Sequence, residues 1–188
     1  MPSQSFNDHL LVLLKDAAEL QDAHAELRTG ARGRQWGLGA LNRATVVMCV
    51  SAWEAYVEEL VRESLELLQP AGNQLGTWPA LKAAAFSQLG RFNTPNAQNV
   101  RALFQTAVGL PDVTRGWRWQ GCEPAKARSS LDWAMKLRHQ IAHGVTPRPI
   151  VHNKDSSWLT GFFGRLGRCT DNTVRCYLVS ELGLAKPW

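Results

Sequence analysis

Seven consecutive residues, Arg138 to Gly144, carry the side chains best suited to chemistry in this sequence, because they place a permanent cation close to two imidazoles. An arginine can bind a phosphate, and a histidine can move a proton near neutral pH. Cutting RNA without a metal needs a base for the 2′-hydroxyl, an acid for the leaving 5′-oxygen and a cation for the phosphate. Arg138 and His143 cover two of these roles, and two copies would cover all three.

The end of a helix is expected to bring these side chains together. Five residues turn an ideal helix by about 140°, so Arg138 and His143 do not share a face directly. Arginine is long, however, and Gly144 lets the backbone leave the helix just after His143. His139 and His143 are four residues apart and share a face. The bland alternative is that Arg138 pairs with an acid and His143 binds the last helical carbonyls.

The sequence gives no sign of a metal site or another cofactor. His139 and His143 form an HxxxH pair, but it has neither the intervening Glu of HExxH nor an evident third ligand. The four cysteines form no CxxC pair, which favours a reducing cytoplasm as the setting. No apolar run approaches the roughly 20 residues that a membrane span requires.

Hydrophobic periodicity predicts an all-α fold, a bundle of about five to six helices in a single domain over residues 1–188. The second helix is apolar nearly all round from Ala44 to Trp53, as in the buried central helix of a bundle. Residues 110–125 are expected to form a loop, and the glycine-rich stretch 161–167 is expected to be mobile. The helices are expected at 6–27, 38–68, 78–89, 97–108, 129–143 and, as helix rather than strand, 170–182.

The charge distribution favours a polyanion as partner. The net charge is +5 and the pI is about 9.3. Arg32 and Arg34 lie in an arginine-rich segment without acids, and Trp117, Arg118 and Trp119 interleave aromatic and basic side chains. Such interleaving suits single-stranded RNA. The alternative, a solvated loop whose two tryptophans belong to the core, is about equally compatible with the sequence.

Three segments together resemble a known family. The stretch 137–144 resembles the Arg-x4-6-His signature of the HEPN superfamily, and residues 43–60 look like its glutamate-bearing second helix. The segment Asn93-Thr94-Pro95-Asn96 is similar to the connecting segment of the RiboL-PSP-HEPN subgroup. The resemblance runs in the expected order from about residue 38 to 146.

This resemblance implies a metal-independent endoribonuclease, usually a homodimer with its active site at the interface. Arg138 would stabilise the scissile phosphate, His143 would be the acid or base, and His139 would orient the phosphate or His143. Attack by the 2′-hydroxyl would leave a 2′,3′-cyclic phosphate, in a toxin or antiviral defence role with a possible antitoxin protein as partner. The alternative is a non-catalytic HEPN module that binds RNA, nucleotide or a partner protein.

Glu54 is the remaining candidate for the site. A carboxylate next to Trp53 in so apolar a segment is costly to bury without a partner. We therefore expect Glu54 to contact Arg138, a histidine or a backbone group, and the pair with Arg138 would hold the guanidinium in place. The alternative is that Glu54 points to solvent at the edge of the buried stripe.

Overall fold

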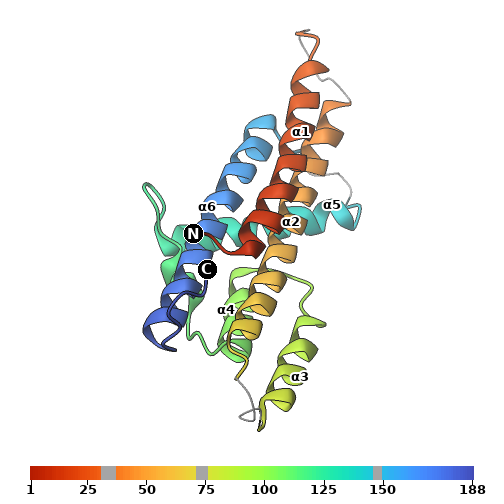
Figure 1. Cartoon of the computed structure of the whole chain (residues 1–188). Coiled ribbons are helices and arrows are strands. Elements are labelled where there is room, and N and C mark those ends of the chain that lie inside the picture. The colour runs from red at the N-terminus through yellow and green to blue at the C-terminus, as the bar shows by residue number, and fades with distance from the viewer. Residues whose placement is uncertain (31–36, 71–75, 146–149) are drawn as a thin grey trace.

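A computed structural model describes residues 1–30, 37–70, 76–145 and 150–188 of the chain. The described residues form six α-helices, one π-helix and one 3-10 helix, and no strand, so the predicted all-α helical fold is confirmed (Figure 1). No helix among them is both long and apolar enough to cross a membrane. The elements are η1 (Ser5–Leu11), α1 (Val12–Glu26), α2 (Leu38–Leu67), α3 (Trp78–Leu89), α4 (Ala97–Ala107), η2 (Val113–Gly116), α5 (Pro124–Ala142) and α6 (Asn153–Ser180).

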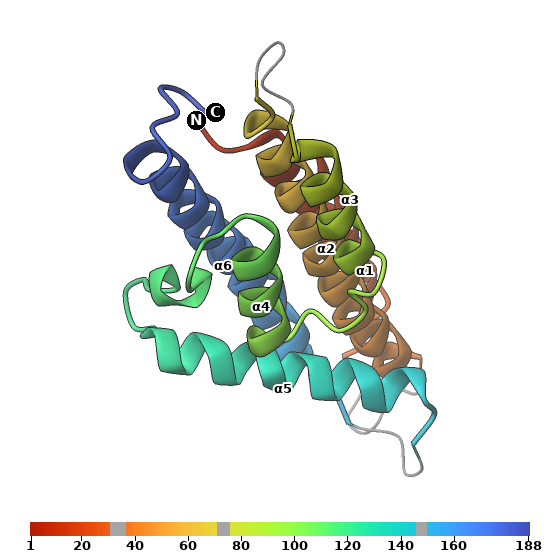
Figure 2. The ribbon, with the colours of Figure 1, turned by 90° about the horizontal axis from the view of Figure 1, so that it is seen from below.

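Helix α2 is the centre of the bundle. It packs against α1, α4, α5 and α6. Figure 1 shows α1 and α6 beside it, with α3 and α4 at its lower end. Seen from below, α5 runs across the other helices (Figure 2). The nearly uncharged centre of α2 explains this position, because an apolar surface on all sides can only be covered by several neighbours.

Helix α6 corrects one prediction. The glycine-rich stretch 161–167 is not a mobile segment but lies inside this helix, which begins at Asn153 rather than near residue 170. Gly167 permits close packing: a Cβ there would overlap the Leu10 side chain, and the Tyr56 hydroxyl donates to the Gly167 carbonyl at 2.9 Å. The glycines were thus misread, because a missing side chain also allows two helices to approach closely.

Helix α5 also begins earlier than predicted. Its first residue is Pro124 rather than Ser129, and proline suits a first helical position because its missing N–H would have no partner there. Its other end agrees with the prediction, because Ala142 is the last helical residue and His143 is the cap. Nineteen residues give α5 a length of about 28 Å, enough to cross the bundle.

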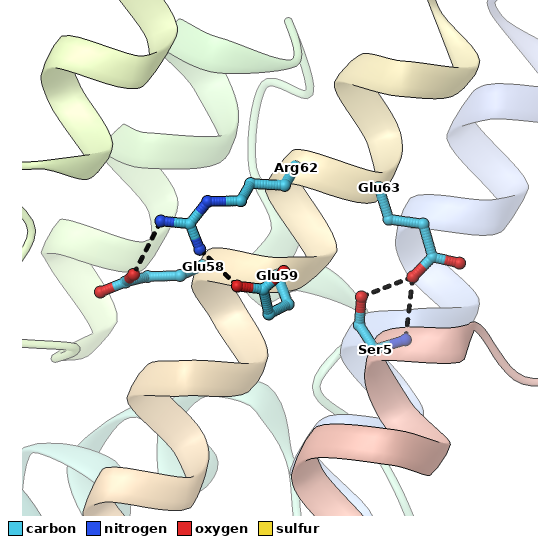
Figure 3. A network of polar contacts seen from close by, with 5 residues as sticks. All are labelled: Ser5, Glu58, Glu59, Arg62 and Glu63. Carbon is cyan, nitrogen blue, oxygen red and sulfur yellow. Dashed lines mark hydrogen bonds and ion pairs between the residues drawn. The ribbon is translucent and has the colours of Figure 1, made fainter.

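Two carboxylates fix the beginning of the chain to the bundle. Glu63 of α2 accepts from the backbone N–H of Ser5 at 2.9 Å and from its hydroxyl (Figure 3). Asp171 of α6 accepts from the backbone N–H of Ser3 at 3.2 Å. Negative charge at a helix N-terminus satisfies N–H groups that have no partner within the helix. The first turn therefore contacts both α2 and α6.

Candidate active site

The end of α5 is closed by a defined backbone cap. Gly144 has a φ of 61°, in the left-handed region that favours glycine. The N–H of His143 donates to the His139 carbonyl at 3.0 Å, and the N–H of Val145 reaches back to the Gln140 carbonyl at 3.3 Å. This is the hydrogen-bond pattern of a Schellman motif, which satisfies the last carbonyls of a helix. His143 therefore stands at a fixed position, not on a frayed end.

His139 and His143 form an exposed pair on this end of α5. Their ring centroids are 4.1 Å apart, and the ring planes are inclined by 45°. Within the described part of the chain neither imidazole makes a side-chain hydrogen bond, and backbone N–H groups satisfy the last carbonyls. The alternative in which the His143 side chain binds the last helical carbonyls is therefore not seen. Both rings are accessible to a ligand.

Arg138 lies on the inner side of the same helix end, near Glu54 of α2. Both side chains are partly buried. Burial raises the pKa of Glu54, the positive charge of Arg138 lowers it, and the Glu58 carboxylate raises it, with burial the largest effect. Arg138 and Glu54 thus interact through charge, although among the described residues they form no ion pair as close as the one between Arg62 and Glu59, at 2.6 Å. The structure brings the two residues together but shows no direct bond.

A short row of charges continues from Glu54 along α2. Glu58, one turn further, binds Arg62 at 3.2 Å, and Arg62 also binds Glu59 (Figure 3). Because Arg62 is paired with two acids of α2, these acids largely neutralise its charge. Among the described residues, Arg138 is therefore the cation that acts on the Glu54 carboxylate.

The segment before α4 connects α2 to α5 close to the site. The Trp53 indole N–H donates to the Pro95 carbonyl at 2.9 Å, and Trp53 directly precedes Glu54. Two residues after Pro95, the N–H of Ala97 donates to the Asp132 carboxylate of α5 at 3.1 Å. The segment that carries part of the family resemblance thus has a structural role, because it joins the two helices that hold Glu54 and Arg138. Sequence reasoning did not identify Asp132, since nothing local marks its partner 35 residues away.

The predicted RNA-binding segment is only partly available to a ligand. Trp117 is wholly buried, and its indole N–H donates to the Thr170 hydroxyl at 2.9 Å. The prediction that Trp117 contacts RNA was therefore wrong. Arg118 is exposed and forms an ion pair with Glu123 at 2.9 Å.

The other predicted RNA contacts divide in the same way. Trp119 is partly buried, with its ring 5.9 Å from that of Phe162. Arg32 and Arg34 lie outside the described residues. The alternative interpretation, with tryptophans in the core, is therefore correct for Trp117.

Metal and thiol chemistry have little support in the described residues. No group of three His, Cys, Asp or Glu side chains in that part of the chain could hold a metal ion. The four cysteines are free thiols. Burial raises the pKa of the Cys49 thiol to about 11, although a hydrogen bond to Thr160 opposes this. Cys49 is therefore a protonated core residue, because only a thiolate is an effective nucleophile.

One comparison with known proteins gave a match. The family model described as RiboL-PSP-HEPN matches residues 12–175, from the first residue of α1 to within the last two turns of α6. No curated protein and no solved structure matches the chain significantly. The match covers more of the chain than the segment 38–146 in which the sequence showed the resemblance.

Proposed function

Because the chain belongs to the RiboL-PSP-HEPN family, we propose that it is a metal-independent endoribonuclease that cleaves single-stranded RNA. One observation carries the proposal. The capped end of α5 presents the exposed imidazoles of His139 and His143 beside Arg138, whose charge acts on a partly buried carboxylate. A phosphate ligand, a proton carrier and a positioning acid are the groups that such a reaction needs.

The reaction proceeds by attack of the ribose 2′-oxygen on the adjacent phosphorus. A base removes the 2′-hydroxyl proton, the new O2′–P bond forms, and the P–O5′ bond breaks as an acid protonates the departing 5′-oxygen. The products are a 2′,3′-cyclic phosphate and a 5′-hydroxyl. Arg138 stabilises the charge that develops on the phosphate, and His143 transfers a proton. His139 orients the phosphate or His143, and Glu54 positions Arg138.

A homodimer supplies the second proton-transfer group. One His143 cannot be base and acid in the same concerted step, whereas two copies facing each other across a cleft can divide the two tasks. The exposure of both imidazoles is compatible with such an arrangement. A toxin or antiviral defence role, with an antitoxin protein that covers the cleft, is proposed by analogy with the family alone.

The test is cleavage of single-stranded RNA in EDTA by the purified protein and by the variants Arg138→Ala and His143→Ala. We expect the His143 variant to lose at least about 100-fold in rate, the lower range for removing a general acid or base. DNA of the same sequence should not be cut, because it has no 2′-hydroxyl. Mass analysis of the products should find a cyclic phosphate.

Two substitutions elsewhere serve as matched controls. His9→Ala removes an imidazole from η1, and Arg91→Ala removes an exposed guanidinium between α3 and α4. Both controls should cut RNA at the rate of the unchanged protein. If all variants cut equally, the activity is a contaminant and the proposal is lost. RNA binding without cleavage by any form would support the non-catalytic alternative instead.

The dimer is tested separately by sedimentation of the unchanged protein. We expect the mass of two chains at micromolar concentration. A monomer that still cleaves RNA would contradict the division of base and acid between two His143 residues, although it would leave the ribonuclease proposal standing.

A further inference from the structure

Helix α6 carries a row of cations on one side. Arg165, Arg168 and Arg175 stand at positions i, i+3 and i+10, which keeps them on one face of the helix. Within the described part of the chain none of the three forms an ion pair, and the guanidinium carbon of Arg168 lies over the Phe6 ring at 5.4 Å from its centroid. Their charge is therefore available to an external anion.

The two acids of this helix do not neutralise the row. Asp155 accepts from the His152 N–H at 3.2 Å in the capping box at the start of α6. Asp171 is buried and accepts from Ser3. Both carboxylates are thus engaged with backbone groups. Asp171 lies beside Arg168 and Arg175, whereas no acid of α6 lies beside Arg165 in its pocket.

Aromatic rings stand at one end of this row. Trp158, seven residues before Arg165, is 45% exposed, and its ring is stacked on Phe162 with centroids 4.8 Å apart and planes inclined by 18°. Trp133 of α5 is 42% exposed and stands edge-on to Trp158 at 6.1 Å. Large exposed aromatic surfaces of this kind are costly to leave in water and often mark a binding site.

Trp158, Phe162 and Arg165 line a pocket of about 290 Å³, which we call the α6 pocket, and Trp133 lies beside Trp158 without lining it. Trp158 and Phe162 form an aromatic side, Trp119 comes from the segment before α5, and Lys126 and Arg165 bring positive charge from α5 and α6. Its volume is at the lower end of the range for small-ligand sites, which suits one nucleotide. Aromatic faces beside cations are the combination with which proteins bind single-stranded nucleic acid.

We propose that the α6 pocket binds one nucleotide of the RNA substrate, with the base stacked on Trp158 and the phosphate held by Lys126 and Arg165. The inference rests on the proposed ribonuclease function, and it adds a binding subsite outside the catalytic residues. Arg168 and Arg175 line a second hollow of about 460 Å³ further along α6, together with Arg118 and the Asp171 carboxylate, whose oxygens accept from Ser3.

The α6 pocket lies within reach of the catalytic end of α5. Ser130, which lines the pocket from α5, precedes His143 by 13 residues, or about 20 Å along a helix. A strand held at Trp158 would span this distance with a few nucleotides. The pocket thus binds the substrate at a position away from the bond that is cut.

The test measures binding rather than cleavage. The probe is a fluorescein-labelled 12-nucleotide 2′-O-methyl oligouridine, which cannot be cut because its 2′-oxygens are blocked. We expect Trp158→Ala to weaken binding at least about 5-fold, and Trp158→Phe to restore most of it, since stacking on one base is worth several-fold or more in affinity. We expect Arg165→Ala to weaken binding and to reduce the slope of log affinity against log salt by about 0.7.

Arg91→Ala is the matched control, because it removes one exposed arginine far from α6. It should leave both the affinity for the probe and the salt dependence of that affinity unchanged. Thermal melting checks that each variant is folded. If Trp158→Ala does not fold, the affinity of Arg165→Ala tests the inference. Binding by Trp158→Ala and Arg165→Ala equal to that of the unchanged protein overturns the inference. The inference is also overturned if Trp158→Ala is a monomer, the unchanged protein is a dimer, and both bind RNA equally. The exposed aromatic face would then bind a second copy of the chain. Because the probe cannot be cleaved, a failure of catalysis leaves this result unaffected.

Discussion

Two pairs of tryptophans share almost the same geometry but differ in everything around them. Trp53 and Trp117 meet edge to face with centroids 6.0 Å apart and planes at 75°. Trp133 and Trp158 meet in the same way at 6.1 Å and 67°. The first pair is wholly buried, and each indole N–H has an acceptor, Pro95 or Thr170. The second pair is more than two-fifths exposed.

The comparison shows that ring contact alone does not assign a role to a tryptophan. A buried indole with a bonded N–H stabilises the fold through its area and its hydrogen bond. An exposed pair contributes little burial, and one of its members, Trp158, shares a pocket with Lys126 and Arg165. We therefore assign the inner pair to the architecture and propose a binding role for Trp158.

Trp53→Ala should have the largest effect on the inner pair. It leaves a cavity in the core and removes the bond to Pro95, so we expect the free energy of unfolding to fall by about 3–5 kcal/mol. Chemical denaturation measures this loss. The matched change Trp133→Ala in the outer pair should cost much less, and equal losses at the two positions would remove the distinction.

Trp117→Phe should have the second largest effect. Phenylalanine keeps an aromatic ring but cannot donate to Thr170, so we expect a loss of roughly 1–3 kcal/mol from the missing hydrogen bond and the smaller volume. The Thr170 hydroxyl still donates to the Leu166 carbonyl. RNA affinity should stay unchanged in this variant, and a large loss of affinity without unfolding would mean that Trp117 reaches the ligand after all.

The outer pair can be examined by a double-mutant cycle. Trp133→Ala, Trp158→Ala and the double variant should give a coupling in unfolding free energy of about 0.5–1.5 kcal/mol, as for other aromatic pairs. Urea denaturation of all four proteins would measure this coupling. A coupling near zero would mean that the two rings are held apart in solution, so that Trp133 does not support the position of Trp158.

Glu54 should show the smallest effect, at the border between the inner pair and the site. Burial raises its pKa above the ordinary value of 4.5, so the folded state holds this proton more tightly than the unfolded chain. Its stabilising contribution is full below pH 4.5 and is lost as the pH rises through the folded pKa. At pH 7 the ionised carboxylate opposes folding, and Glu54→Gln should melt at a slightly higher temperature than the unchanged protein.

The difference in melting temperature should disappear when the measurement is repeated at pH 4. Glu66→Gln, an exposed change on the same helix, is the control and should shift neither temperature. A lower melting temperature for Glu54→Gln at pH 7 would show that attraction to Arg138 outweighs burial. If Glu54 positions Arg138, the same variant should cleave RNA more slowly while it is the more stable protein.

Most of the fold could be predicted from local pattern. The apolar centre of α2, the beginning of α4 at Ala97, and the stop at Gly144 are properties of a few neighbouring residues, and all three were predicted correctly. The glycines of α6 could not be read in this way. Whether Gly167 marks a mobile segment or a close approach depends on Leu10, which lies far away in the sequence.

The candidate site divides along the same line. Arg138, His139 and His143 are marked by residue type and spacing, and the expected proximity of Glu54 to Arg138 follows from the apolar segment around it. The fate of a tryptophan is not marked, because the acceptor that buries Trp117 lies 53 residues away. The cations of α6 also stayed hidden, since their common face is defined only once residues 153–180 form one helix.

The tie between Ser3 and Asp171 bears on how the chain is made. The two residues are 168 positions apart, and Tyr56 and Gly167 are joined across 111. A ribosome adds about 5–20 residues per second, so the first turn waits roughly 10–30 s for its acceptor. We expect the nascent chain to stay open until α6 leaves the exit tunnel. The Arg138 to His143 segment emerges before then, and it would complete a site only after α6 has packed against α2.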